Sequence, residues 1–98
     1  MRMSKIEITG PTSLPKEILT NQLLELVQGR LMTIQEEKSE IIHDIELYQK
    51  KYGFSNDIFL EKWLMGQLGD DQDFFVWESS LNLLKKLDEE EVILREIL

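Results

Sequence analysis

The chain has 98 residues, of which 42% are hydrophobic, and this length and composition allow one small domain with a modest core. It contains no cysteine, which excludes a disulfide framework and a thiolate metal site and fits a reducing cytoplasm. Nineteen acidic residues against eleven basic ones give a net charge of −8, which disfavours nucleic acid as the main ligand and favours a basic protein partner.

The N-terminal residues alternate in a way that predicts one short strand over residues 4–9. Ile6 and Ile8 would point to one face, with Lys5, Glu7 and Thr9 on the other, before Gly10-Pro11 ends the strand. Because a lone strand cannot satisfy its own backbone groups, it needs a second copy or the edge of another sheet. We therefore expect Ile6 and Ile8 to contribute to dimerisation.

A long helical pattern follows and is predicted to begin at the segment 13–17, where a proline stands in the first turn. Its seam alternates steps of three and four through Leu24, Val27, Leu31, Ile34, Lys38, Ile41, Ile45, Tyr48 and Tyr52, and only Lys38 is not apolar. An unbroken helix would be about 57 Å long, too long for a compact globule of this size. A break at Gly29 and an unbroken helix both remain open.

The seam itself has two interpretations. It is either an ordinary core stripe or a coiled-coil surface that pairs with a second copy of the chain. In the second case the dimerisation residues are Leu31, Ile34, Ile41, Ile45 and Tyr48.

Two further helices are predicted in the C-terminal half. Lys50, Lys51 and Gly53 would end the long helix, and Ser55 would cap a short helix with Phe59 or Leu60, Trp63 and Leu64 on its buried side. The last helix would begin near Asp71–Asp73 and run to about Leu94. Its buried stripe would consist of Phe74, Trp77, Leu81, Leu84 and Leu87. The fold class is mainly α, with a short strand and three or four helices in one domain, divided into a dimerising part (1–53) and a partner-binding part (54–98).

The stretch "GQLGDDQDFFVW", residues 66–77, brings three aspartates close to three aromatic side chains. A calcium loop would need a glycine between its acidic ligands, whereas here the glycines precede them. The acids are better explained as helix-start residues, because free N–H groups and the helix dipole favour carboxylates there. The single histidine, His43, has no catalytic companions, so we expect no enzyme activity, no metal and no cofactor.

An acidic run, Asp88-Glu89-Glu90-Glu91, lies on the last turns of the final helix. Such a run is usually a solvated face, and the alternative is a docking surface for lysines and arginines of another protein. No apolar stretch approaches the roughly 20 residues that span a bilayer, and the first residues lack the apolar segment of a secretory signal. We therefore expect a cytoplasmic protein with no membrane partner.

The segment 51–81, "KYGFSNDIFLEKWLMGQLGDDQDFFVWESSL", resembles the C-terminal segment of small bacterial and archaeal antitoxins of type II toxin–antitoxin systems. The resemblance covers about a third of the chain. The matching residues are Tyr52, Gly53, Ser55, Gly66, Leu68, Gly69, Asp70, Asp71, Asp73, Phe74 and Trp77.

The resemblance implies a protein that binds and neutralises a cognate toxin, commonly a ribonuclease or another translation-blocking enzyme. Acidic and aromatic side chains would then cover a basic active site. The residues expected to bind this partner are Trp63, Asp70, Asp71, Asp73, Phe74, Trp77, Asp88, Glu89, Glu90 and Glu91. The alternative is a homodimeric helical regulator or adaptor without a toxin.

Many such antitoxins also bind operator DNA through an N-terminal ribbon-helix-helix domain, and residues 4–9 followed by helices could imitate that fold. Here Glu7 would stand on the outward strand face, where a groove-reading ribbon prefers basic or neutral polar side chains. Residues 1–35 carry only four basic residues against three acidic ones. This charge argues against operator binding.

Overall fold

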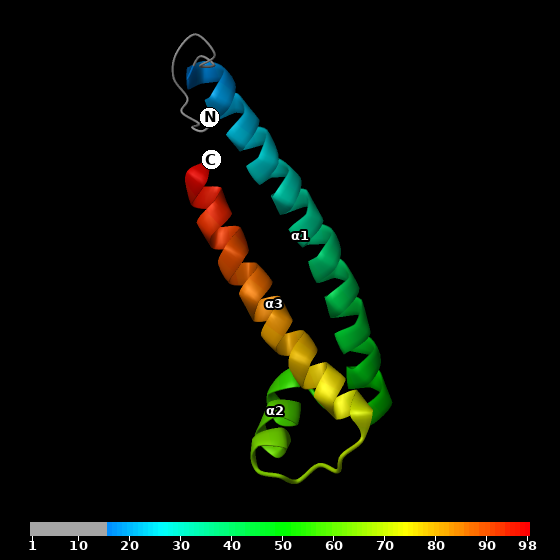
Figure 1. The fold of residues 1–98 in the computed structure, drawn as a ribbon. Helices are drawn as coiled ribbons and strands as arrows, with labels where there is room; N and C mark the ends of the chain where they lie inside the picture. The colour runs from blue at the N-terminus through cyan, green and yellow to red at the C-terminus, as the bar shows by residue number, and fades with distance from the viewer. Residues whose placement is uncertain (1–15) are drawn as a thin grey trace, which may run out of the picture.

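The structure is a computed structural model and describes residues 16–98, which form three helices. They are α1 (Lys16–Tyr52), α2 (Asn56–Leu64) and α3 (Gln72–Ile97). The two long helices run antiparallel as a hairpin, and the short α2 lies at the closed end of the hairpin (Figure 1). The mainly helical fold class is thus confirmed for this part of the chain. The predicted strand over residues 4–9, with Ile6 and Ile8, lies outside the described residues.

Helix α1 is continuous through Gly29, which answers the question that the sequence left open. A glycine in a helix interior weakens the helix by only about 1 kcal/mol relative to alanine, and the neighbouring turns can compensate for that. Helix α1 has 37 residues, so it is about 55 Å long. The chain accommodates this length by being elongated, with principal extents of 65 × 23 × 18 Å.

The helix ends follow the predicted local signals. Gly53 has a φ of 74°, the left-handed conformation that ends α1. The Ser55 hydroxyl accepts a hydrogen bond from the Ile58 backbone N–H at 3.2 Å and caps α2. Asp71 caps α3 by accepting a hydrogen bond from the Asp73 backbone N–H at 2.8 Å. These three ends direct the chain from α1 through α2 into α3.

The core sits at the closed end of the hairpin and is largely aromatic. Ile45 of α1, Phe59 of α2 and two residues of α3, Phe74 and Trp77, form its buried cluster. The prediction that Leu64 lies on the buried side of α2 is wrong, because this side chain is 82% exposed at the last residue of the helix. The short α2 thus contributes a single fully buried side chain to the core.

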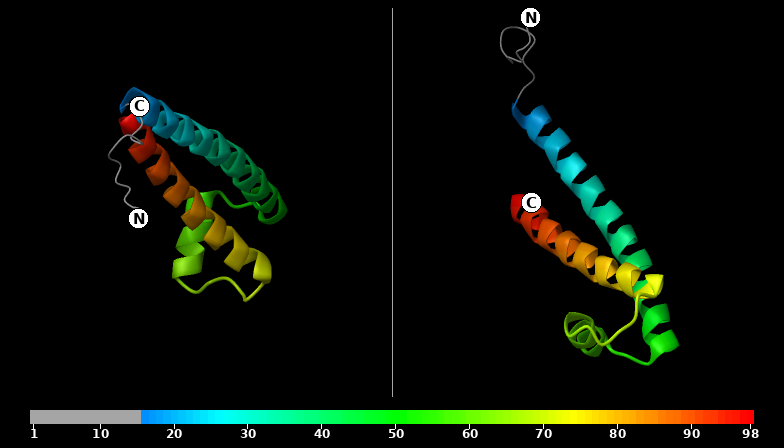
Figure 2. Two further views of the ribbon diagram at one scale, coloured as in Figure 1. Left: turned by 45° about the horizontal axis from the view of Figure 1, so that its top comes forward. Right: turned by 60° about the horizontal axis from the view of Figure 1, so that its bottom comes forward.

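The hairpin is unequal in length, and α1 continues past the C-terminal end of α3 (Figures 1 and 2). The radius of gyration is 20.9 Å, against about 13 Å for a compact domain of 100 residues. Leu23 and Leu26 of the projecting part are 61% and 70% exposed. Since α3 ends at Ile97, nothing within residues 16–98 covers these leucines.

Candidate functional site

The aromatic cluster at the closed end fixes how α2 and α3 meet. The rings of Phe59 and Trp77 stack with centroids 4.0 Å apart and planes 5° from parallel. The Trp77 indole N–H donates to the Asn56 side-chain oxygen at 3.0 Å, so the one polar atom of this buried ring is satisfied. Tyr48 of α1 stacks on the same indole at 5.8 Å. The expected partner anchors Phe74 and Trp77 are thus 8% and 0% exposed, and both hold the chain's own helices together.

Asp73 joins the end of α1 to the start of α3. Its carboxylate accepts hydrogen bonds from the Lys51 ammonium and the Tyr52 hydroxyl, each at 2.7 Å. The hydrogen bond from Lys51 is the main reason that the pKa of Asp73 lies below its usual value. The same contact raises the pKa of Lys51 to about 12. We call this group of three residues the clasp. The sequence does not predict it, because a lysine in the last turn of a helix is already explained by its favourable interaction with the helix dipole.

The acidic run on α3 is divided between the hairpin interface and the solvent. The Glu90 carboxylate accepts hydrogen bonds from the Arg30 guanidinium at 2.7 and 2.9 Å, and this lowers the pKa of Glu90. The Lys38 ammonium lies 2.6 Å from Asp88 and 2.9 Å from Glu91. Glu89 is exposed and forms no ion pair within residues 16–98. Three of the four acids of this run, all of which were expected to bind a partner, therefore already pair with α1.

Lys38, the polar break in the α1 seam, has its explanation in these contacts. Along the seam it lies between Ile34 and Ile41, on the side of α1 that meets α3. Its side chain is 20% exposed. Two carboxylates raise its pKa, through hydrogen bonds from its ammonium first to Asp88 and then to Glu91. A cation at this seam position therefore matches the acidic stretch of α3 and helps to set the register of the two helices.

The residues expected to form a dimer seam are packed within a single chain. Leu31, Ile34 and Ile45 are 7%, 0% and 3% exposed, while Ile41 and Tyr48 pack against the aromatic core cluster. The structure thus shows the core-stripe interpretation for this part of α1. In this fold the seam already has its partner in the chain's own helices.

The outer surface of the closed end combines apolar and acidic side chains. Leu64, Met65 and Phe75 are 82%, 64% and 51% exposed. The half-buried Trp63 packs edge-on against Phe75 with centroids 5.0 Å apart. Asp70 and Asp71 are exposed in the loop that leads into α3. We call this set the tip surface; it consists of Trp63, Leu64, Met65, Asp70, Asp71 and Phe75.

Sequence reasoning missed Leu64, Met65 and Phe75 as candidate binding residues. A pattern of spacing assigns an apolar residue near a helix end to the core by default. Only the position of α2 relative to α3 shows which side chains remain outside. The available signal was that α2, a helix of nine residues, has more apolar residues than a helix of that length can bury.

Residues 16–98 contain no group of three or more histidine, cysteine or carboxylate side chains that is arranged to hold a metal ion. His43 is exposed on α1. None of the helices in the same range is both long and apolar enough to cross a membrane.

Comparison with known proteins finds one uncharacterized relative. The chain is similar to an uncharacterized protein of Mycoplasma genitalium, with 35% identity over 66 residues. The matched region covers 64% of this chain and 49% of the relative, so the chain spans about half the length of the curated protein it matches. No protein-family model matches the chain. No solved structure matches it either.

Proposed function

We propose that this chain is an antitoxin, a non-enzymatic protein that binds a basic protein toxin and blocks its active site. The observation that carries the proposal is the tip surface, where exposed apolar side chains and exposed aspartates lie at the same end of the hairpin. The resemblance of residues 51–81 to antitoxin segments and the net charge of −8 support it. The proposal places the activity in the cytoplasm, where such toxins block translation.

The chemistry of the tip surface suits a basic partner. Protein–protein interfaces obtain most of their affinity from a few large apolar and aromatic anchors, and complementary charges add association rate and specificity. Leu64, Met65 and Phe75 would supply the anchors, while Asp70 and Asp71 would face cations on the toxin. If the toxin is a ribonuclease, these carboxylates would compete with RNA phosphates for the same lysines and arginines.

The structure suggests different roles for the residues that the sequence grouped together. Phe74 and Trp77 are buried, and Asp73 belongs to the clasp, so in the proposal they hold the tip surface in shape. Trp63 is half-buried and would contribute both to the core and to the contact with the toxin. Asp88, Glu90 and Glu91 would act mainly within the hairpin, and Glu89 remains available to a partner.

A homodimeric helical regulator without a toxin is the second candidate. The observation that favours it is a row of exposed apolar side chains on α3, including Leu83, Ile93 and Ile97, which are 48%, 60% and 55% exposed. This row adjoins the tip surface, because Phe75 and Leu83 line the same hollow, but Ile93 and Ile97 lie outside that hollow. Variants at Ile93 or Ile97 therefore distinguish the two candidates.

The test is co-expression of this chain with the protein encoded by the adjoining reading frame, which the proposal expects to be small and basic. The proposal expects that this neighbour arrests growth alone, that the chain restores growth, and that the two proteins copurify. A neighbour that is harmless alone, or that does not copurify with the chain, would overturn the proposal.

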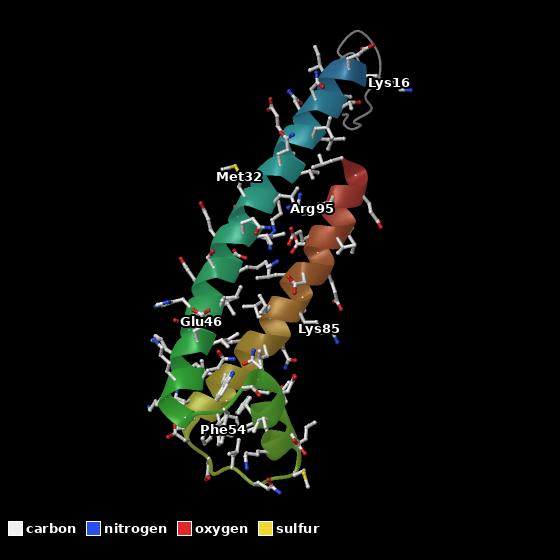
Figure 3. All side chains as sticks on the ribbon, turned by 180° about the vertical axis from the view of Figure 1, so that it is seen from behind. Lys16, Met32, Glu46, Phe54, Lys85 and Arg95 are labelled. Atoms are coloured by element: carbon white, nitrogen blue, oxygen red, sulfur yellow. The ribbon has the colours of Figure 1, made fainter. Side chains whose placement is uncertain are left out.

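Matched variants then locate the contact. Leu64→Asp and Phe75→Asp each place a charge on the tip surface and should abolish rescue and copurification. Met32→Asp changes a side chain that is 67% exposed on the side of α1 away from α3, and it should rescue as well as the unchanged chain (Figure 3). Loss with all three variants alike, or with none, would contradict the tip surface as the binding site.

A further inference from the structure

Helix α3 has a second row of side chains in addition to the one that it buries against α1. This row, the outer stripe, consists of Val76, Ser79, Leu83, Lys86, Ile93 and Ile97, with Glu90 at the remaining position. Its members follow each other by steps of three and four over three heptads, which is the spacing of a coiled-coil seam. Its large apolar members are between 39% and 60% exposed. No helix within residues 16–98 covers this side of α3 over its C-terminal turns (Figure 1).

We propose that the outer stripe pairs antiparallel with the outer stripe of a second copy of this chain. The inference goes beyond the proposed function, and it holds or fails independently of any toxin. The evidence for a second copy as occupant is that the stripe is complementary to itself in charge and in shape.

Charge complementarity comes from the two ionised positions near the middle of the stripe. In an antiparallel pair centred between Lys86 and Glu90, each Lys86 meets Glu90 of the second copy, so both interactions are attractive. The same register places Leu83 opposite Ile93, so apolar positions meet apolar ones. A shift by one heptad in either direction would oppose Leu83 to Lys86 or Ile93 to Glu90. A parallel pair would place Lys86 against Lys86.

Shape complementarity comes from the serines at the start of α3. A shallow hollow of about 290 Å³ lies at Ser79 and Ser80, and its other lining residues are Gln72, Phe75, Val76 and Leu83. The antiparallel register places Ile97 of the second copy opposite Ser79, where its side chain can enter the hollow as a knob enters a hole. The smallest side chains of the stripe thus face a large apolar one, and two-fold symmetry repeats this contact at the other end.

The free charges around the stripe agree with this arrangement. Lys85 and Lys86 are exposed and form no ion pair within residues 16–98, although most other described cations near the hairpin interface do. Glu90 keeps about two-fifths of its side chain exposed while it binds Arg30. Its carboxylate can therefore accept a further hydrogen bond from Lys86 of a second copy.

The first test is the mass of the purified chain alone by sedimentation equilibrium over a wide range of concentration. The unchanged chain should pass from monomer to dimer as concentration rises. Leu83→Asp should raise the dissociation constant of the dimer by at least about tenfold, since it places a charge in the seam. Met32→Asp should dimerise like the unchanged chain. A chain that is monomeric throughout, or a Leu83→Asp variant that dimerises normally, would overturn the proposal.

The second test separates pairing between chains from effects within one helix. Lys86→Glu and Glu90→Lys alone should each weaken the dimer, because each creates two like-charge pairs. An equimolar mixture of the two variants should form a heterodimer, because all its central pairs are attractive again. Mixing cannot restore the contact with Arg30 that Glu90→Lys loses within its own chain, so a recovered dimer reports the pairs between the two chains. Failure of the mixture to dimerise, with both variants helical by circular dichroism, would overturn the antiparallel register.

Discussion

Trp77 lies flat against Phe59, with ring centroids 4.0 Å apart and an angle of 5° between the planes. Both side chains are completely buried. Among residues 16–98 this is the only parallel ring stack between α2 and α3, and Tyr48 of α1 stacks on the same Trp77 indole. Only seven apolar side chains of residues 16–98 are buried, and four of them form the cluster at the closed end, so the stability of that end rests on very few residues.

Phe59→Ala should therefore destabilise the chain strongly. Truncation of a buried phenylalanine costs about 3–5 kcal/mol, because apolar contact is lost and a cavity remains. Phe75→Ala is the matched control: Phe75 is half-exposed and touches Trp63 edge-on, so we expect a loss of about 1 kcal/mol or less. Urea unfolding followed by circular dichroism measures both. Similar losses for the two variants would show that the stacked pair is not the centre of the core.

Two glycines of this chain should respond to alanine in opposite directions. Gly29 lies inside α1 with nothing within 4 Å of an added Cβ, so Gly29→Ala should raise the free energy of unfolding by about 1 kcal/mol. Gly53 has a φ of 74° at the end of α1, and Gly53→Ala should lower it by about 1–2 kcal/mol. Thermal unfolding of both variants measures these changes in the free energy of unfolding. A destabilising Gly29→Ala would mean that α1 is not a regular helix at that position.

The clasp predicts a loss of stability in acid. The pKa of Asp73 is lower in the folded chain than in the unfolded one, so the folded chain keeps this carboxylate charged where the unfolded chain takes up a proton. Its stabilising contribution is complete above about pH 4, the ordinary aspartate pKa, and is lost as pH falls through the lower folded-state pKa. Asp73→Asn should thus be less stable than the unchanged chain at neutral pH and should show a smaller loss between neutral pH and about pH 3.

The control for the clasp is Glu46→Gln, an exposed carboxylate of α1 with no ion pair among residues 16–98. It should leave the pH dependence of the urea midpoint unchanged. If Asp73→Asn keeps the full acid sensitivity of the unchanged chain, the sensitivity arises elsewhere, and Glu90 and Glu91 would be the next carboxylates to replace.

Lys38→Met tests whether the ion pairs or an apolar seam hold the middle of the hairpin. Removal of the ammonium leaves Asp88 without its cation, so the variant should be less stable than the unchanged chain at low salt. The difference in stability between the variant and the unchanged chain should narrow as the Debye length falls from about 30 Å at 0.01 M salt to about 3 Å at 1 M. A variant that is as stable or more stable at both salt concentrations would mean that the apolar stem of methionine outweighs the lost pairs.

Local features of the fold could be read from single residues and their close neighbours. Ser55, Gly53 and Asp71 act at helix ends through interactions that span two to four residues, so the residue types alone are sufficient to predict them. The helical periodicity of α3 likewise predicted the burial of Phe74, Trp77 and Leu87.

The candidate surfaces were less predictable, because a residue's exposure depends on elements far away in the sequence. The sequence assigned Asp73 to a helix start and the run at 88–91 to a solvated face or a docking surface, but α1 supplies Lys51, Arg30 and Lys38 to these acids from 22 to 60 residues away. Leu64 looked like a core residue and is mostly exposed. Pairings of this kind depend on which helices meet and in which register, and no local rule contains that information.

The sequence by itself determined that residues 16–98 are mainly helical, where α2 and α3 begin, and which stripe of each long helix is apolar. The tertiary structure decided that α1 is continuous and that its seam is used within the chain. It also decided that three of the four acids of the run at 88–91 pair with α1 and that α3 carries a second, uncovered row. The physical reason is that helix propensity and capping act over one or two turns, whereas burial and ion pairing are set by the other helix that each side chain meets.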